Sequence, residues 1–220
     1  MARTQLRRPA TGAFARVPGG VAFLLGARGR LARAAIAVVD ADGLVRVAAV
    51  PRLRVGVRAT GSGRAEVRFP GLAVDPLGRR GYLVGEEGVF VVDLRTLAVA
   101  RSGPLRSLAK AVVSTYRSAA WIGDGLVAVS GADQNAGART PYGLRVLDVR
   151  RWTLRMVDPT ASSFARAGRL LLVEQARDRR ALEVTAYDVL GRVRYRTRLA
   201  GVTWMKKGER LGYACRDAML

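Results

Sequence analysis

The side chains that most enzymes use for proton transfer or nucleophilic attack are scarce in this chain. It has no histidine, and Cys215 is its single cysteine. These counts exclude Ser-His and Cys-His catalytic pairs, zinc or haem sites built on histidine, and disulfides within the chain. We expect Cys215 to be a small apolar strand residue. The sequence therefore predicts no catalytic residue, no metal ligand set and no cofactor.

One route to hydrolytic chemistry stays open, namely a cage of carboxylate and amide oxygens around a hard cation such as Ca²⁺. The candidate ligands are Asp124, Asp133, Asn135 and Glu174. Asn135 is the only asparagine in the chain, so the donor set is poor. A metal-dependent enzyme is therefore kept as the third of three functional alternatives.

The charge balance is strongly basic. Lys plus Arg is 38 and Asp plus Glu is 17, which gives a net charge of +21, and all the cations except Lys110, Lys206 and Lys207 are arginines. One interpretation is a surface that binds polyanions through guanidinium groups. The other is coding bias, because a GC-rich genome favours Arg, Ala, Gly and Val together. A steep salt dependence of binding separates the two.

Four stretches share one pattern in which an alternating apolar run ends on Asp, turns, and begins a second alternating run. An example is "VFVVDLRTLAVARSG" (89–103). The four aspartates are Asp40, Asp93, Asp148 and Asp188. An aspartate at such a place can accept hydrogen bonds from the backbone N–H groups of its own turn. One such residue per repeat indicates a structural role rather than a catalytic one.

Each of these stretches follows another strand pair around a turn that contains glycine, a hairpin signal because glycine accepts positive φ. The repeated unit is thus four antiparallel strands, which is typical of a β-propeller blade. We predict an all-β chain and a single propeller domain over 1–220. Its expected parts are complete blades at 12–50, 71–103, 118–158 and 162–198 and a half blade at 202–216.

The segment "LAVDPLGRRGYLVGEEGVFVVDLRTLAVA" (72–100) resembles the YVTN and WD40-like repeats of bacterial propeller proteins. The resemblance extends loosely over about 12–216. It implies a propeller fold and a binding or scaffold role, and it carries over no catalytic residue. The chain departs from WD40 proper in lacking the Gly-His and Trp-Asp dipeptides. The unfinished last blade suits either a small five-bladed ring or a fragment of a six- or seven-bladed protein, and we expect the fragment.

Three long loops are expected to share one rim of such a propeller, at 51–71, 104–118 and 131–143. The apolar spacing after Pro104 predicts a short helix near 105–116. The candidate binding residues on this rim are Arg106, Lys110, Arg117, Asp133, Asn135, Arg139 and Tyr142. These side chains suit an anionic peptide, sugar or nucleic-acid backbone, although solvated loop surface is the competing interpretation.

Three functions remain at this point. The first is a non-catalytic propeller that binds a protein or peptide partner. The second is polyanion or nucleic-acid binding through the Arg-rich loops, and the third is a metal-dependent lactonase- or hydrolase-like propeller enzyme. No apolar run has the length of a signal core or of a transmembrane helix, so the default expectation is a cytoplasmic protein without a membrane span.

Overall fold

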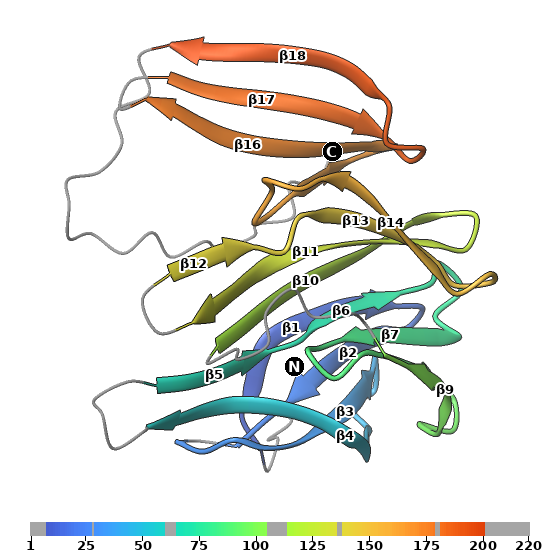
Figure 1. The fold of residues 1–220 in the computed structure, drawn as a ribbon. Helices are drawn as coiled ribbons and strands as arrows, with labels where there is room; N and C mark the ends of the chain where they lie inside the picture. Colours follow the sequence, from blue (N-terminus) through green and yellow to red (C-terminus); the bar gives the residue numbers. More distant parts are fainter. Residues whose placement is uncertain are drawn as a thin grey trace. The chain divides into compact units, whose positions relative to one another are not determined.

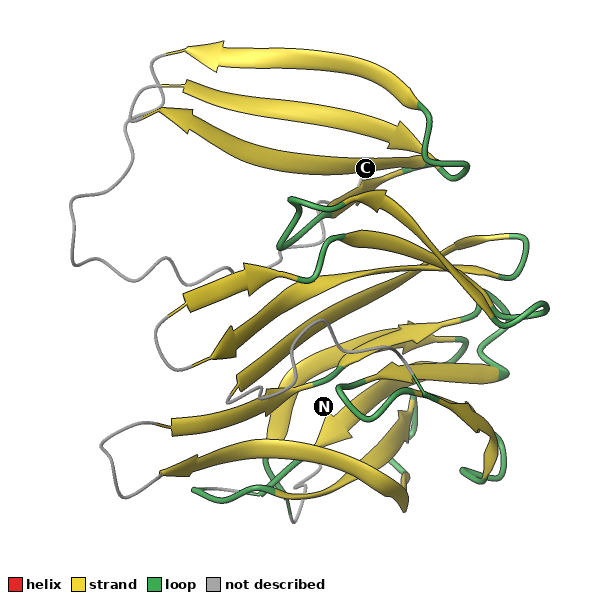
Figure 2. Ribbon diagram, in the orientation of Figure 1, coloured by secondary structure: helices red, strands yellow, loops and turns green. Residues whose placement is uncertain are grey.

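The computed structural model describes residues 8–27, 29–59, 65–104, 114–135, 138–178 and 181–200. Within these residues every regular element is a β-strand (Figure 2), so the prediction of an all-β chain is confirmed. None of the described residues belongs to a helix that could span a membrane. The chain divides into two compact units, Met1–Ser162 and Ser163–Leu220, which we describe separately.

The first unit contains a ten-stranded sheet and a four-stranded sheet (Figure 1). The ten-stranded sheet has two antiparallel four-stranded parts joined through β5 (Ala65–Phe69), which we call the first and third sheets, and the separate four-stranded sheet is the second. The first sheet consists of β1 (Ala10–Val17), β2 (Gly20–Leu25), β3 (Ala32–Asp40) and β4 (Val45–Ala59). The second consists of β6 (Gly71–Val74), β7 (Arg80–Val84), β8 (Val89–Asp93) and β9 (Val99–Gly103). The third consists of β10 (Ser114–Gly123), β11 (Leu126–Asn135), β13 (Leu144–Asp148) and β14 (Thr153–Asp158), and β12 (Ala138–Pro141) pairs with β11 beside it.

The second sheet is buried on both faces, which explains its nearly continuous apolar sequence. Along β7 and β8, successive side chains point to opposite faces. Leu83 and Phe90 join a core with residues of the first sheet such as Ile36. Tyr82 and Val91 join a second core with residues of the third sheet such as Val127 and Val129. The three sheets therefore form a stack within this unit, with the second sheet in the middle.

The strand order within each sheet follows the chain, and one set of turns gathers at one end of the sheets. We call this end the turn edge, formed in the first unit by the turns at 18–19, 40–44, 75–79, 93–97, 123–125 and 148–152. We call the opposite end the loop edge.

The four repeated aspartates accept hydrogen bonds from their own turns, as predicted. Asp93 Oδ1 accepts from the backbone N–H groups of Arg95 and Thr96 at 2.9 and 2.8 Å. Asp148 Oδ1 does the same with residues 150 and 151, at 2.9 and 3.0 Å. Asp40 and Asp188 instead bind the N–H groups two and four residues on, because Gly43 and Gly191 take positive φ in these turns.

The predicted loop at 51–71 is largely strand, which is a correction to the sequence analysis. β4 continues to Ala59 and returns as β5 (Ala65–Phe69), which pairs with it over residues 56–59. β5 then pairs in parallel with the start of β10. The backbone hydrogen bonds of this segment go to a neighbouring strand, so it needs no irregular loop.

The second unit contains one described sheet, a meander of β15 (Ala165–Ala167), β16 (Leu170–Asp178), β17 (Ala181–Asp188) and β18 (Val193–Ala200).

Two predictions from the sequence concern residues that are not fully described. Residues 114–116 of the predicted helix begin β10 instead, because they pair with β5 and β11, and residues 105–113 lie outside the described part. The predicted half blade at 202–216 also lies outside it.

Candidate functional site

The loop edge carries a small sheet that joins the first and third sheets (Figure 1). It is built from residues 56–59 of β4, all of β5, residues 114–117 of β10, residues 132–135 of β11, and β12. We call it the loop-edge sheet. The described parts of the three loops that the sequence predicted on one rim therefore do meet here.

The strand register places charged residues on one face of this sheet. Arg58 lies opposite Glu66, Thr115 lies opposite Asp133, and Arg68 lies beside Thr115. Directly paired residues in neighbouring strands share a face. Two residues further along β10, Arg117 is on the same face. On the other face, the rings of Phe69 and Tyr116 are 5.7 Å apart between centroids.

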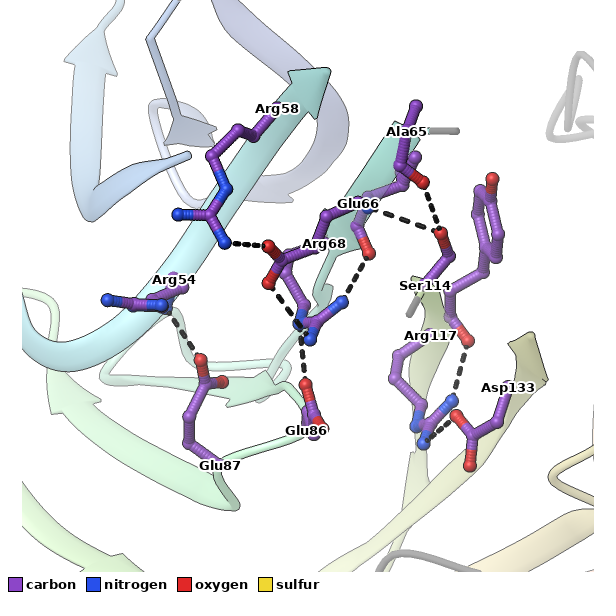
Figure 3. Close-up of polar contacts among 12 residues, drawn as sticks. Arg54, Arg58, Ala65, Glu66, Arg68, Glu86, Glu87, Ser114, Arg117 and Asp133 are labelled. Carbon is purple, nitrogen blue, oxygen red and sulfur yellow. Dashed lines mark hydrogen bonds and ion pairs between the residues drawn. The ribbon is translucent and has the colours of Figure 1, made fainter. Parts of the chain in front are cut away.

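A chain of ion pairs runs across the charged face (Figure 3). Arg58 contacts Glu66, whose other oxygen lies 3.2 Å from Arg68 Nη2. Arg68 Nε lies 2.5 Å from Glu86 Oε2, on the loop between β7 and β8. The Arg68 side chain is buried, and it also donates to the carbonyl of Val67 at 3.1 Å. The second sheet is thereby tied to the loop-edge sheet.

Glu87, next along the same loop, is held differently. Its Oε1 accepts a hydrogen bond from the backbone N–H of Arg54 at 3.2 Å. Its Oε2 is buried and has no hydrogen-bond partner among the described residues. Burial raises the pKa of the Glu87 carboxyl, and its two backbone hydrogen bonds only partly oppose that rise. Of the two carboxyl groups in this loop, Glu86 is therefore paired with a cation, whereas Glu87 is desolvated and has no ion pair among the described residues.

Ser114 joins β5 to β10 at the centre of the sheet. Its hydroxyl donates to the carbonyl of Ala65 at 3.1 Å and accepts from the backbone N–H of Val67 at 3.2 Å. The residue is buried, so both of its bonds are shielded from water. One side chain thus fixes the parallel pairing of two strands that lie far apart in the sequence.

A second, isolated ion pair lies at the base of the β11–β12 hairpin. Asp133 Oδ1 is 2.6 Å from Arg117 Nη2, in the alignment of an ion pair rather than of a hydrogen bond. The side chains of Asp133 and Arg117 are 3% and 2% exposed. Arg117 also donates from Nη1 to the carbonyls of Tyr116 and Ala132. Its guanidinium carbon lies 3.9 Å from the centroid of the Tyr142 ring, a cation–π contact.

Tyr142 is buried between two cations and a backbone turn. Arg145 also lies over its ring at 4.3 Å and donates from Nε to the Tyr142 carbonyl. The Tyr142 hydroxyl has no hydrogen-bond partner in the described part of the chain. Burial raises the pKa of this phenol, and the neighbouring arginines oppose the rise. The group is therefore a neutral phenol at physiological pH.

The structure separates the predicted binding residues into three groups. Arg117, Asp133 and Tyr142 come together, but all three are buried, and Arg117 lies within β10. Asn135 and Arg139 are exposed on the β11–β12 hairpin. Arg106 and Lys110 lie outside the described residues. The loop 131–143 is itself mostly hairpin, because residues 132–135 pair with residues 138–141.

The proposed calcium cage is not formed as a set. Asp124 lies in the turn before β11, whereas Asp133 is seven residues beyond the first residue of β11, about 23 Å along the strand at the usual rise of ~3.3 Å per residue. Asp133 already faces Arg117. No three acidic, histidine or cysteine residues gather around a common point anywhere the structure describes side chains.

Sequence reasoning missed the carboxylates that neutralise this edge, namely Glu66, Glu86 and Glu87. It predicted a cationic rim from the basic residues of the three loops at 51–71, 104–118 and 131–143. A signal was present, because "GEEG" at 85–88 is the one loop between buried strands with two adjacent acids, and the chain has few acids to place. The sequence does not show which residues these acids contact, because their partners lie in other strands.

No family model matches the sequence, and no curated protein matches it. Among solved structures, hydrazine synthase of Kuenenia stuttgartiensis aligns with a TM-score of 0.53 at 16% identity, over 90% of this chain and 52% of that chain. The present chain thus spans about half the length of that protein, and the likeness is one of fold alone.

Two further solved structures give lower scores. The β-propeller domain of Myceliophteria thermophila Cps50 (Swd1) aligns with a TM-score of 0.44 at 12% identity, over 86% of this chain and 69% of that chain. Puromycin hydrolase aligns with a TM-score of 0.43 at 19% identity, over 80% of this chain and 26% of that chain.

Proposed function

We propose that this chain is a non-catalytic binding module for a protein or peptide partner, and that its stacked sheets are blades of a β-propeller. The propeller rests on the repeated four-stranded antiparallel unit and on the second sheet, which is covered on both faces by its neighbours. The binding role rests on one observation above all, the loop-edge sheet.

The loop-edge sheet has the properties of a rigid platform. Five strand segments are joined by backbone pairing, Ser114 fixes the central pair, and the Arg68–Glu86 ion pair holds the sheet to the loop at 85–88. Binding to a preorganised surface avoids the entropic cost of ordering it. The β11–β12 hairpin at its margin presents exposed amide, hydroxyl and guanidinium groups from Gln134, Thr140 and Arg139.

The partner surface is a protein segment with at least one acidic side chain. Arg58, Arg68 and Arg117 are already engaged by carboxylates of this chain. Exposed Arg139 has no ion pair among the described residues, so it is available to a carboxylate of a partner. Pro141 on the same short strand lacks an N–H, which discourages open-ended strand addition and favours recognition by side chains.

The test is a selection of random linear peptides displayed on phage against the immobilised chain, followed by titration of the enriched peptides. We expect enrichment of acidic peptides whose binding weakens about tenfold in Arg139→Glu, as charge reversal at a contact predicts. The matched control is Arg196→Glu on exposed β18, which makes the same charge change elsewhere. It should bind as the unchanged protein does.

Three results contradict the proposal. One is that no peptide is enriched, and another is that Arg196→Glu weakens binding as much as Arg139→Glu. The third concerns nucleic acid, because a labelled random-sequence oligonucleotide bound at physiological salt with a steep salt slope would show that the arginines serve a polyanion. Thermal unfolding of each variant verifies that it remains folded.

A further inference from the structure

The turn edge holds a depression that none of the functions above uses. It has a volume of about 380 Å³ and lies between the first and second sheets. Its lining includes the apolar side chains of Val17, Val38 and Leu94. Three cations line it, namely Arg46, Arg79 and Arg95. Pockets of a few hundred Å³ with an apolar lining and a few polar groups are the usual form of small-molecule sites.

Two contacts between the sheets involve residues that line the pocket. In the first, the turns meet at Pro18 and Gly78, where a Cβ added to Gly78 would lie 2.2 Å from Pro18 Cδ. In the second, Arg46 Nη1 donates to the carbonyl of Arg95 at 2.5 Å. The Pro18–Gly78 contact is tightly packed, with no room for a larger side chain at Gly78. The hydrogen bond to Arg95 uses one of the five N–H donors of Arg46. The pocket is thus shaped by the packing of the sheets.

The charges around the pocket favour an anion. Asp40 and Asp93 also line it, but each already accepts backbone N–H groups of its own turn through Oδ1. Within the described part of the chain, the side chains of Arg79 and Arg95 make neither a hydrogen bond nor an ion pair. Three guanidinium groups against two hydrogen-bonded carboxylates leave a net positive site with apolar side chains in its lining.

We propose that this pocket binds an organic carboxylate with an apolar body. The body lies on Val17, Val38 and Leu94, and the carboxylate meets the guanidinium groups at the rim, where forked donors match its two oxygens. Two sources share this chemistry, a free small acid and the C-terminal residue of a peptide chain. The site is independent of the loop edge and does not rest on the partner-binding role.

The experiment follows amide chemical shifts of Gly78 and Arg95 while probes are added. The probes are indole-3-acetate, its uncharged amide, and a short peptide ending in Leu with a free or an amidated C-terminus. We expect saturable shifts with the free carboxylates and weaker ones with the amides. Saturation by indole-3-acetate alone assigns the site to free acids, and tighter binding of the peptide carboxylate assigns it to chain termini.

Variants test the rim directly. Arg95→Gln removes a charge-assisted contact, so we expect affinity for the carboxylate to fall about tenfold. Leu77→Asp places an anion beside the pocket at an exposed turn position and should weaken the acid but not its amide. The control is Arg33→Gln, an exposed arginine at the other end of β3, which should bind normally.

Three outcomes overturn the proposal. The first is the absence of saturable shifts with every carboxylate probe at millimolar concentration. The second is equal binding of acid and amide, and the third is equal loss of affinity in Arg33→Gln and Arg95→Gln. Either of the last two would show that the rim charges do not recognise the ligand.

Discussion

The two ends of the sheets are built by different means. At the turn edge of the first unit, each repeated aspartate binds backbone N–H groups within four residues of itself. At the loop edge, the key contacts join residues far apart in the chain, such as Ser114 with Ala65 and Arg68 with Glu86. The first end repeats one local solution, whereas the second is unique and is held by buried charge. The turn edge is therefore determined by residues that are close in the sequence, whereas the loop edge is determined by tertiary contacts.

The largest expected effect is at the loop edge. Asp133→Ala leaves the Arg117 guanidinium buried without its counter-charge, so we expect a loss of about 3–5 kcal/mol in the free energy of unfolding. Urea unfolding measures it, with exposed Glu174→Ala as the control. In the double variant Arg117→Met with Asp133→Leu, most of the loss should be recovered because no charge stays buried. A loss below about 1 kcal/mol in Asp133→Ala would show that the pair is solvated.

A smaller loss is expected from Ser114→Ala. This change removes the hydroxyl from the Ala65 carbonyl and the Val67 N–H, and each buried group left unpaired costs about 1–3 kcal/mol. The urea midpoint should fall, and hydrogen exchange at Val67 should accelerate. The control is Ser102→Ala on exposed β9. Equal midpoints for the two variants would show that Ser114 does not hold the parallel pair.

At the turn edge, replacing Asp93 should lower the free energy of unfolding by less than either change above, and the loss should depend on pH. The N–H of Thr96, the Thr96 hydroxyl and the N–H of Arg95 lower the pKa of Asp93. A carboxyl with a lowered folded-state pKa stabilises the fold above its unfolded pKa, near 4, and loses that contribution as the pH falls through the folded value. Asp93→Asn should therefore be less stable than the unchanged protein at pH 7, and the difference should shrink as the pH falls below about 4 and close below the folded-state pKa.

The control for that change is Asp42→Asn, an exposed acid in the β3–β4 turn whose side chain accepts no hydrogen bond from that turn among the described residues. Its unfolding free energy should follow the unchanged protein at both pH values. A difference for Asp93→Asn that does not depend on pH would contradict the assigned role of the carboxylate.

Replacing Glu87 should change the free energy of unfolding at pH 7 in the opposite direction. Burial raises the pKa of its carboxyl, so the ionised form is disfavoured in the folded state at pH 7, and this cost disappears as the pH falls through the folded pKa. Glu87→Gln should be slightly more stable than the unchanged protein at pH 7 and equal to it near pH 4. Destabilisation by Glu87→Gln at pH 7 would show that the carboxylate serves an ion pair instead.

The sequence predicted the turn edge well because its determinants are local. Alternation, an aspartate and a turn glycine lie within one hairpin, so Asp93 and Asp148 were assigned their structural role from residues beside them. The structure has groups of antiparallel strands at Ala10–Ala59, Gly71–Gly103, Ser114–Asp158 and Ala165–Ala200, and their assignment to propeller blades stays a prediction.

The loop edge was predicted less well because partners from elsewhere decide it. Arg52 takes a φ of 67°, which no local signal marks, and β4 runs on past it because β5 and β10 supply its backbone partners. Arg117 has the composition of a surface residue, yet Asp133 and the Tyr142 ring make its burial tolerable. A charged residue in one strand does not reveal its partner in another.

The rigidity of the loop-edge sheet is the claim on which the proposed function depends, and native-state hydrogen exchange tests it most directly. The amides of Val67 and Tyr142 report on the loop edge, those of Thr96 and Arg151 on the turns, and that of Leu83 on the core. We predict that Val67 and Tyr142 exchange only with the same large free energy of opening as Leu83, while Thr96 and Arg151 exchange through small local openings. Exchange of Val67 and Tyr142 through local opening, with Leu83 still protected, would show that the loop edge is not a preformed platform.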